Sequence, residues 1–91
     1  MFNYFLTREA KEDLWRIYEF GVYRFGEKQA DNYLMMLHDC FDKIASNPFM
    51  FPRVSRYKKV DYFCVCGVDT VYYNVKGKEI EIVTIIGRQD F

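Results

Sequence analysis

Cys64 and Cys66, separated by one valine, are the residues of this chain whose types first suggest chemistry. Structural zinc needs four ligands and commonly uses cysteine pairs with longer spacing. The other candidate ligands, Cys40 and His38, lie two positions apart on a predicted helix and therefore point to different faces. In a strand, Cys64 and Cys66 point to the same side, as small buried hydrophobic residues do. We therefore predict structural cysteines that fill space, with no metal and no cofactor.

Acid–base or nucleophilic catalysis finds little support in the sequence. The single histidine, His38, falls on the polar or boundary side of a helix, where solvation is its ordinary role. Glu9, Glu12 and Asp13 suit the first turns of a helix, where negative charge is favoured. A nucleophile needs a base within hydrogen-bond reach, and no such pair stands out. We therefore expect a protein that acts by binding, with no catalytic residue.

A basic loop is predicted over residues 48–59, and it contains four cations beside Tyr57: Arg53, Arg56, Lys58 and Lys59. Cations next to aromatic rings can grip phosphates or stack on bases. A solvated loop is the alternative. Arg88 differs from these four because it directly follows a buried strand and is held by a rigid element. These five cations are the candidates for engaging a target.

Two rows of apolar residues lie beside the predicted core stripes of the helices. The rows are Trp15, Tyr18 and Val22 on the first helix, and Tyr33, Met36 and Cys40 on the second. One interpretation is a wide core stripe in a small protein. The other is a groove for the amphipathic helix of a partner, since Met and Trp suit adaptable interfaces.

Periodicity and turn residues predict the element order β-α-α-β-β-β. The expected elements are a strand over Phe2–Thr7, a helix from Thr7 as N-cap to about Phe25, a helix over about Glu27–Ser46, and strands over about Val60–Cys66, Thr70–Lys76 and Glu79–Gly87. The helix stripes expected to be buried are Ala10, Leu14, Ile17, Gly21 and Phe25, then Ala30, Leu34, Leu37, Phe41 and Ile44. This order of elements predicts an α+β fold, in which a helical hairpin packs on a mostly antiparallel sheet.

The last predicted strand is apolar on both faces. Strict alternation places Ile80, Ile82 and Ile86 on one face with Thr84, and Val83 and Ile85 on the other. Such a strand belongs near the middle of a sheet and is covered at least partly on both sides. Because the helical hairpin can cover only one side, we expect a partner peptide to shield the other.

Composition narrows the class of protein. Residues 1–91 are expected to form one domain, and 51% of them are hydrophobic. Thirteen Lys and Arg balance thirteen Asp and Glu, so indiscriminate binding to nucleic acid is unfavourable. No apolar run approaches the ~20 residues of a membrane span. Three cysteines and the lack of a secretory leader indicate a reducing, cytoplasmic setting.

Four segments of the chain resemble, in order, the ParE branch of the RelE/ParE superfamily of type II toxins. They are Ala10–Tyr18 (AxxDLxxIxxY), Phe25–Ala30, the helix ending Ile44-Ala45-Ser46-Asn47-Pro48, and the C-terminal segment from Tyr72-Tyr73-Asn74-Val75 to Gly87-Arg88-Gln89-Asp90. The resemblance implies a β-α-α-β-β-β fold and an antitoxin whose C-terminal segment wraps the toxin as helix and strand, in a hetero-oligomer. Such a partner would cover the two helix rows, and it makes Trp15, Tyr18, Val22, Tyr33, Met36 and Cys40 the antitoxin-binding candidates.

The resemblance implies two alternative targets. ParE proteins poison DNA gyrase and carry no known hydrolytic centre, whereas RelE proteins cut mRNA in the ribosomal A site with a cationic cluster. Docking into ribosomal RNA favours a large cationic surface, and this chain has no net charge. Its last residues, Gln89-Asp90-Phe91, also lack a late Tyr or His. We therefore expect a gyrase poison; the alternative is an mRNA endonuclease using Arg56, Lys58, Lys59 and Arg88.

Overall fold

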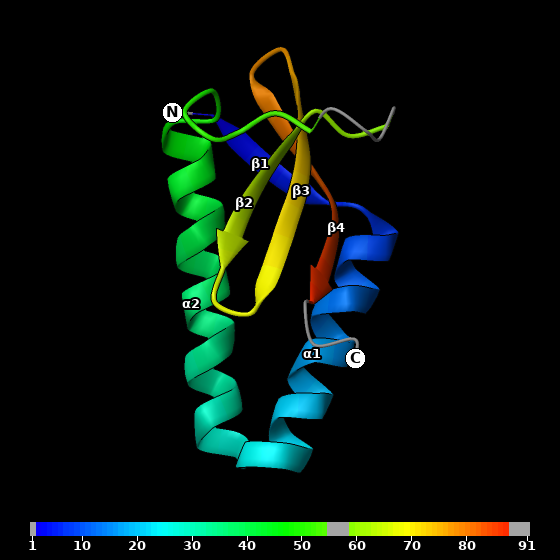
Figure 1. The fold of residues 1–91 in the computed structure, drawn as a ribbon, viewed down its shortest axis with the longest axis vertical. Coiled ribbons are helices and arrows are strands. Elements are labelled where there is room, and N and C mark those ends of the chain that lie inside the picture. The colour runs from blue at the N-terminus through cyan, green and yellow to red at the C-terminus, as the bar shows by residue number, and fades with distance from the viewer. Residues whose placement is uncertain (1, 55–58, 88–91) are drawn as a thin grey trace.

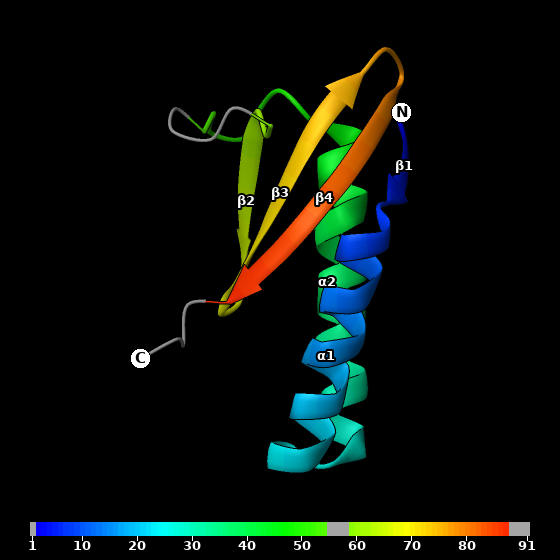
Figure 2. The ribbon, with the colours of Figure 1, turned by 90° about the vertical axis from the view of Figure 1, so that its right-hand side faces the viewer.

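The computed structural model describes residues 2–54 and 59–87. In chain order, the elements are β1 (Asn3–Leu6), α1 (Arg8–Phe25), α2 (Glu27–Ser46), β2 (Tyr62–Cys66), β3 (Asp69–Lys76) and β4 (Glu79–Gly87). The predicted order and the α+β class are confirmed. Figure 1 shows the two helices as an antiparallel hairpin behind the sheet. Figure 2 shows that the sheet covers only the half of the hairpin that contains the start of α1 and the end of α2, and leaves the half around the interhelical turn uncovered.

The helix ends follow from local chemistry. The hydroxyl of Thr7 accepts a hydrogen bond from the amide of Ala10 at 3.1 Å, which caps α1 as predicted. Gly26 separates the helices with a φ of 93°, a value that disfavours any residue with a Cβ. Phe25 was expected to complete the buried stripe, but its side chain is 63% exposed. The reason is that α1 extends beyond the sheet at this end, so the last position of the stripe has no strand to cover it.

The four strands have the order β1-β4-β3-β2. The pairs β2–β3 and β3–β4 are antiparallel, and β1 is parallel to β4. The sheet is therefore mostly antiparallel, with β4 between β1 and β3 as its apolar sequence predicted. The buried core lies between this sheet and the helices, and its largest fully buried side chains include Tyr73, Phe41 and Leu37.

A register shift in β4 overturns the predicted face assignment. Tyr72 pairs with Thr84 and Tyr73 pairs with Ile82, so Val83 has no partner of its own. One extra residue in a strand reverses the alternation beyond it. As a result Ile85 joins the core at 0% exposure, whereas Ile86 is 52% exposed on the outer face. The backbone of β4 is held at this point by Thr7, which donates hydrogen bonds to the carbonyls of Ile82 and Val83.

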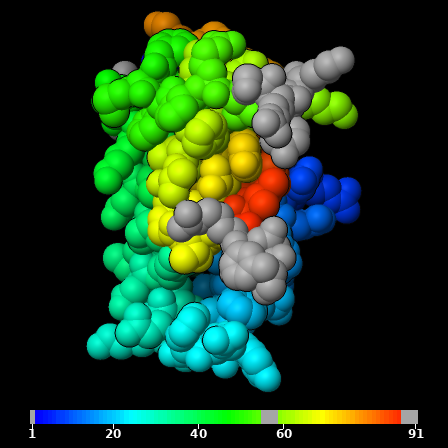
Figure 3. Space-filling model, in the orientation of Figure 1, coloured from blue at the N-terminus to red at the C-terminus, as the bar shows by residue number. Residues whose placement is uncertain are grey.

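The outer face of the sheet keeps apolar side chains that no helix covers. Val65 in β2 and Ile86 in β4 are each more than half exposed. The ring of Phe63 lies 6.3 Å from that of Tyr72 in the neighbouring strand. Figure 3 views the molecule from this side and shows atoms of β2, β3 and β4 (yellow to red) at the surface. Within the described residues, no helix is long and apolar enough to cross a membrane.

Candidate binding surfaces

The first predicted row, Trp15–Tyr18–Val22, lies on the side of α1 that is turned away from the sheet. Asp13 marks the opposite side, since its carboxylate contacts β4. At 100° per residue, Trp15 lies about 200° around the helix from Asp13. The Trp15 ring is 62% exposed and stacks on Tyr18 at a centroid distance of 6.3 Å.

A pocket of about 310 Å³ adjoins this row. Its lining is mostly apolar and comes from both helices: Lys11, Leu14, Trp15 and Tyr18 of α1, with Asp31 and Leu34 of α2. The hydroxyl of Tyr18 donates a hydrogen bond to Asp31 Oδ1 at 2.7 Å, which fixes the ring across the helix pair and raises the pKa of Tyr18. A mostly apolar pocket that is also lined by a lysine and an aspartate suits an amphipathic side-chain row from a partner.

The second predicted row lies elsewhere, because Tyr33, Met36 and Cys40 face the sheet. The hydroxyl of Tyr33 donates to Asp69 Oδ2 at 2.5 Å and accepts from the amide of Val68 at 3.2 Å, so it holds the β2–β3 turn. Burial raises the pKa of Tyr33, and its hydrogen bond to Asp69 adds to that rise. Trp15 and Tyr33 therefore do not share one groove. For Cys40, which is buried, the wide core stripe is the correct interpretation.

The cysteines form one buried cluster. Cys64 and Cys66 lie on the same side of β2, as predicted, and their sulfurs are 3.8 Å apart. Cys40 and Cys66 are joined by a disulfide, whose Cα atoms are 6.4 Å apart. The sequence did not predict this bond, because spacing along the chain gave no sign that α2 would cross the end of β2 at Cys40. Within residues 2–54 and 59–87, no group of three or more His, Cys, Asp or Glu side chains could hold a metal ion.

Of the five candidate cations, the structure describes Arg53 and Lys59. Arg53 lies over Tyr62, with its guanidinium 5.0 Å from the ring centroid and 3.0 Å from the hydroxyl oxygen. Lys59 is exposed, and its backbone carbonyl accepts a hydrogen bond from the Asn74 side chain at 2.8 Å. The side chains of Arg56, Lys58 and Arg88 lie outside the described residues. Arg53 and Lys59 are therefore anchored on β2 and β3, respectively.

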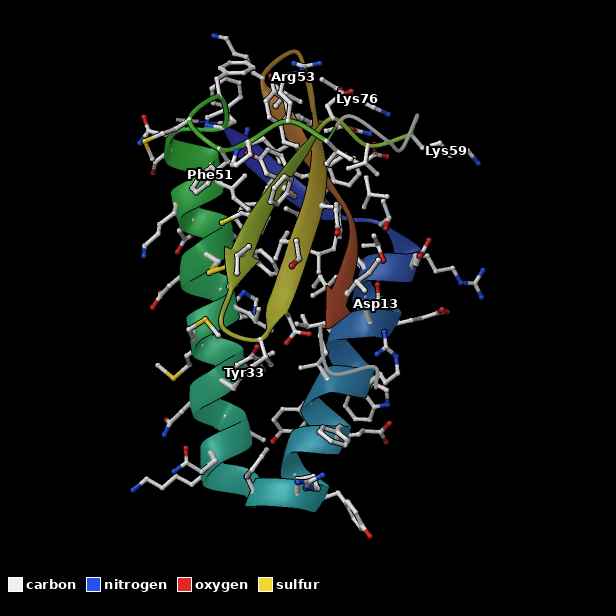
Figure 4. All side chains as sticks on the ribbon, in the orientation of Figure 1. Asp13, Tyr33, Phe51, Arg53, Lys59 and Lys76 are labelled. Carbon is white, nitrogen blue, oxygen red and sulfur yellow. A yellow bond between two sulfur atoms is a disulfide. The ribbon has the colours of Figure 1, made fainter. Side chains whose placement is uncertain are left out.

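The structure does not bring Lys59, at the described end of the basic loop, next to the end of β4. Asn74, which holds Lys59, pairs with Glu81 near the start of that strand. Gly87, the residue before Arg88, lies six residues further along β4, a length of about 20 Å. Figure 4 shows Arg53 and Lys59 at the end of the sheet remote from Tyr33.

Asp13 is a structural residue that sequence reasoning assigned only to the helix dipole. Its Oδ2 accepts hydrogen bonds from the Thr84 hydroxyl at 2.7 Å and from the amide of Ile85 at 3.0 Å. Its Oδ1 accepts from Arg16 of the next turn. The presence of Asp13 in the Ala10–Tyr18 motif was the only indication of a special role. The sequence around position 13 does not show that this residue contacts position 85.

The family model for the ParE toxin of type II toxin–antitoxin systems, parDE, matches residues 4–90. The chain belongs to the ParE toxin family. It is 31% identical over 83 residues to Toxin ParE1 of Caulobacter vibrioides, covering 91% of this chain and 85% of that protein. The solved structure titled "Chromosomal ParDE TA system from P. aeruginosa" has the same fold, with a TM-score of 0.84 at 24% identity and 96% coverage of both chains.

The segments that carry the ParE resemblance have physical roles in this structure. Ala10, at 0% exposure, lets α1 approach the sheet, and Asp13 of the same motif bonds β4. Ala30 packs against Gly21, where an added Cβ would lie 3.3 Å from its own. Pro48, which ends the second helix, offers its carbonyl to the Tyr73 hydroxyl at 2.7 Å. The ParE motifs therefore describe the contacts between helices and sheet.

Proposed function

We propose that this chain is a toxin that inhibits DNA gyrase by binding, without catalysing a reaction, and that a cognate antitoxin neutralises it in the bacterial cytoplasm. The observation that carries the proposal is the match of the ParE toxin family over residues 4–90. The relatives of known name point the same way, since one is Toxin ParE1 and another belongs to a ParDE system.

The physical features favour a gyrase poison over a ribosome-dependent nuclease. A surface that docks into ribosomal RNA gains from excess positive charge, and this chain has a net charge of zero. A phosphate-gripping cluster also needs its cations together. Lys59 is held by Asn74 near the start of β4, whereas Arg88 follows the end of that strand.

Gyrase assays test the target directly. Purified toxin should inhibit supercoiling of relaxed plasmid and should trap cleaved DNA that appears after denaturation of the enzyme. Arg88→Ala is expected to abolish this activity, whereas antitoxin binding should persist. Folded toxin that leaves supercoiling untouched at micromolar excess would reject the gyrase proposal. Discrete cuts within codons of translated mRNA, found by primer extension after brief induction, would support the nuclease alternative.

The antitoxin is proposed to bind the pocket beside Trp15, Tyr18 and Val22. Of the two candidate rows, this one is available to a partner, because Trp15 is 62% and Val22 is 37% exposed. Tyr33 and Cys40 already contact the β2–β3 turn and the end of β2. A partner helix with apolar side chains every three or four residues would fill the pocket, and a cation on it could pair with Asp31 of the pocket lining.

A further inference from the structure

The end of β4 is the part of the sheet that Arg88 follows in the sequence. Gly87, the last residue of the strand, pairs with Asp69, the first residue of β3. On the other side of β4, pairing with β1 ends at Leu6 and Ile82. Within the described part of the chain, no strand follows β1 along residues 83–87. This end of β4 therefore needs other contacts to fix its direction.

Helix α1 supplies the first of these contacts through Asp13. The amide of Ile85 points to the edge that β1 has left, and Asp13 Oδ2 accepts its hydrogen bond at 3.0 Å. The same oxygen accepts from Thr84 at 2.7 Å. A carboxylate is a stronger acceptor than a strand carbonyl. Arg16 bonds the other oxygen of Asp13, which holds the carboxylate in place.

Helix α2 supplies the second contact through Tyr33. Its hydroxyl donates to the carboxylate of Asp69, which is only 3% exposed. A buried carboxylate needs such a partner, because burying it without a hydrogen bond is costly. The same hydroxyl accepts from the amide of Val68, so Tyr33 fixes the turn that leads into β3. Since Asp69 is paired with Gly87, the position of β3 is passed on to the end of β4.

We propose that Asp13 and Tyr33 are positioning residues, because they fix the end of β4, the strand that Arg88 follows in the sequence. Each helix holds one strand of the β3–β4 pair at this end, so the two side chains fix the backbone of β4 up to Gly87. The inference rests on the proposed function, in which Arg88 engages the target. Asp13 lies on the opposite side of α1 from Trp15, and Tyr33 of α2 contacts the β2–β3 turn, so neither residue lines the proposed antitoxin pocket.

Amide hydrogen exchange tests the physical part of the inference without any target. Asp13→Ala should speed exchange of the Ile85 amide at least tenfold relative to the amides of Ile80 and Ile82. Asp13→Asn keeps an oxygen that can accept both hydrogen bonds, so its Ile85 amide should exchange nearly as slowly as in the wild type. Equal protection of Ile85 in all three proteins would overturn the role of Asp13.

Growth arrest on expression without antitoxin tests the functional part, because it does not depend on the identity of the target. Asp13→Ala and Tyr33→Phe should need at least tenfold more toxin for the same arrest. Asp13→Asn should restore toxicity, and Tyr23→Phe, at a position 86% exposed on α1, is the matched control for Tyr33→Phe. The affinity for antitoxin should be the same in every variant as in the wild type. An unchanged affinity also shows that each variant is folded.

Two outcomes separate this inference from the proposed target. If Asp13→Ala arrests growth as the wild type does while its Ile85 amide exchanges faster, the positioning role is rejected and the target proposal is unaffected. If the wild type leaves gyrase supercoiling untouched but growth arrest still depends on Asp13 and is rescued by asparagine, the gyrase proposal is rejected and the positioning role is supported.

Discussion

The hydroxyl of Tyr73, at the centre of the sheet, donates a hydrogen bond of 2.7 Å to the carbonyl of Pro48, just beyond the end of α2. Tyr73 is fully buried, and its ring stacks on that of Tyr62 at 5.4 Å. Burial raises the pKa of Tyr73 above its ordinary value of 10.0. This bond connects β3, one of the two inner strands, to the start of the basic loop just after α2.

Alkaline pH is predicted to unfold the protein through Tyr73. The free energy of unfolding should be independent of this group below pH 10, the ordinary tyrosine pKa, and should fall above it, because only the unfolded chain then releases the proton. Between pH 10 and 11, Tyr73→Phe should reduce the slope of the unfolding free energy against pH by up to one proton, which is about 1.4 kcal/mol per pH unit. Denaturant unfolding at several pH values measures the slope.

Tyr23→Phe is the control for this measurement, since it removes the same hydroxyl group at a position that is 86% exposed. The same pH dependence in wild type and Tyr73→Phe would contradict the assignment. Tyr73→Phe should also lower stability at neutral pH by about 1 kcal/mol, because the Pro48 carbonyl loses its partner.

Gly67→Ala and Gly77→Ala form a matched pair that tests the contact of Tyr33 with the β2–β3 turn. Both glycines have left-handed φ values, 62° and 63°, so each substitution costs about 1–2 kcal/mol of backbone strain. A Cβ at Gly77 meets nothing within 4 Å, whereas at Gly67 it would lie 2.9 Å from the Tyr33 hydroxyl and 3.0 Å from Met36 Cε.

Gly67→Ala should therefore lower the free energy of unfolding by at least 1 kcal/mol more than Gly77→Ala, in line with the cost of overpacking. Chemical denaturation measures both. Because the added methyl group also clashes with the Tyr33 hydroxyl, Gly67→Ala should lose part of its excess cost over Gly77→Ala in a Tyr33→Phe background, while the backbone strain and the contact with Met36 Cε remain. Equal losses for the two alanine variants would show that Tyr33 does not pack tightly on this turn.

Local signals in the sequence predicted the elements well because the helix ends are locally determined. Thr7, Gly26 and Asn47-Pro48 each act on their own turn of backbone, and α2 and β4 have the predicted bounds. The face assignment of β4 failed at Val83, because the bulge there depends on hydrogen bonds from Thr7, 76 positions away along the chain. Alternation within one strand carries no information about such a partner.

The candidate sites were predicted in part for the same reason. The helical spacing of Trp15 and Tyr18 identified an exposed apolar row, but the rotation of each helix about its axis is set by the sheet. Only the fold shows that Tyr33 faces the β2–β3 turn. Asp13 was assigned to the helix dipole because its bonds to Thr84 and Ile85 join residues from opposite ends of the chain.

The disulfide between Cys40 and Cys66 predicts a defined thiol count. Protein prepared without reductant should show one free thiol per chain after denaturation, from Cys64, and three after reduction. Native protein should react more slowly than denatured protein, because burial raises the pKa of Cys64. A cross-link that spans 26 positions should contribute about 3.5 kcal/mol to stability.

Reductant should thus lower the midpoint of unfolding in the wild type and in Cys64→Ala, and it should leave Cys40→Ala unchanged. Three thiols in protein purified without reductant would show that the bond does not form under those conditions. A reductant effect that persists in Cys40→Ala would assign the stabilisation to some other group.

The pocket between the helices gives the sharpest prediction for antitoxin binding. Trp15→Ala removes a ring that is 62% exposed and stacks on Tyr18, so it should weaken antitoxin binding at least 30-fold while changing stability little. Buried aromatic anchors commonly contribute 2 kcal/mol or more to an interface. Tyr23→Ala, on the same helix but outside the pocket lining, should bind as the wild type does. Calorimetric titration of each variant with purified antitoxin measures the affinity, and equal weakening by both substitutions would place the antitoxin on a different surface of α1.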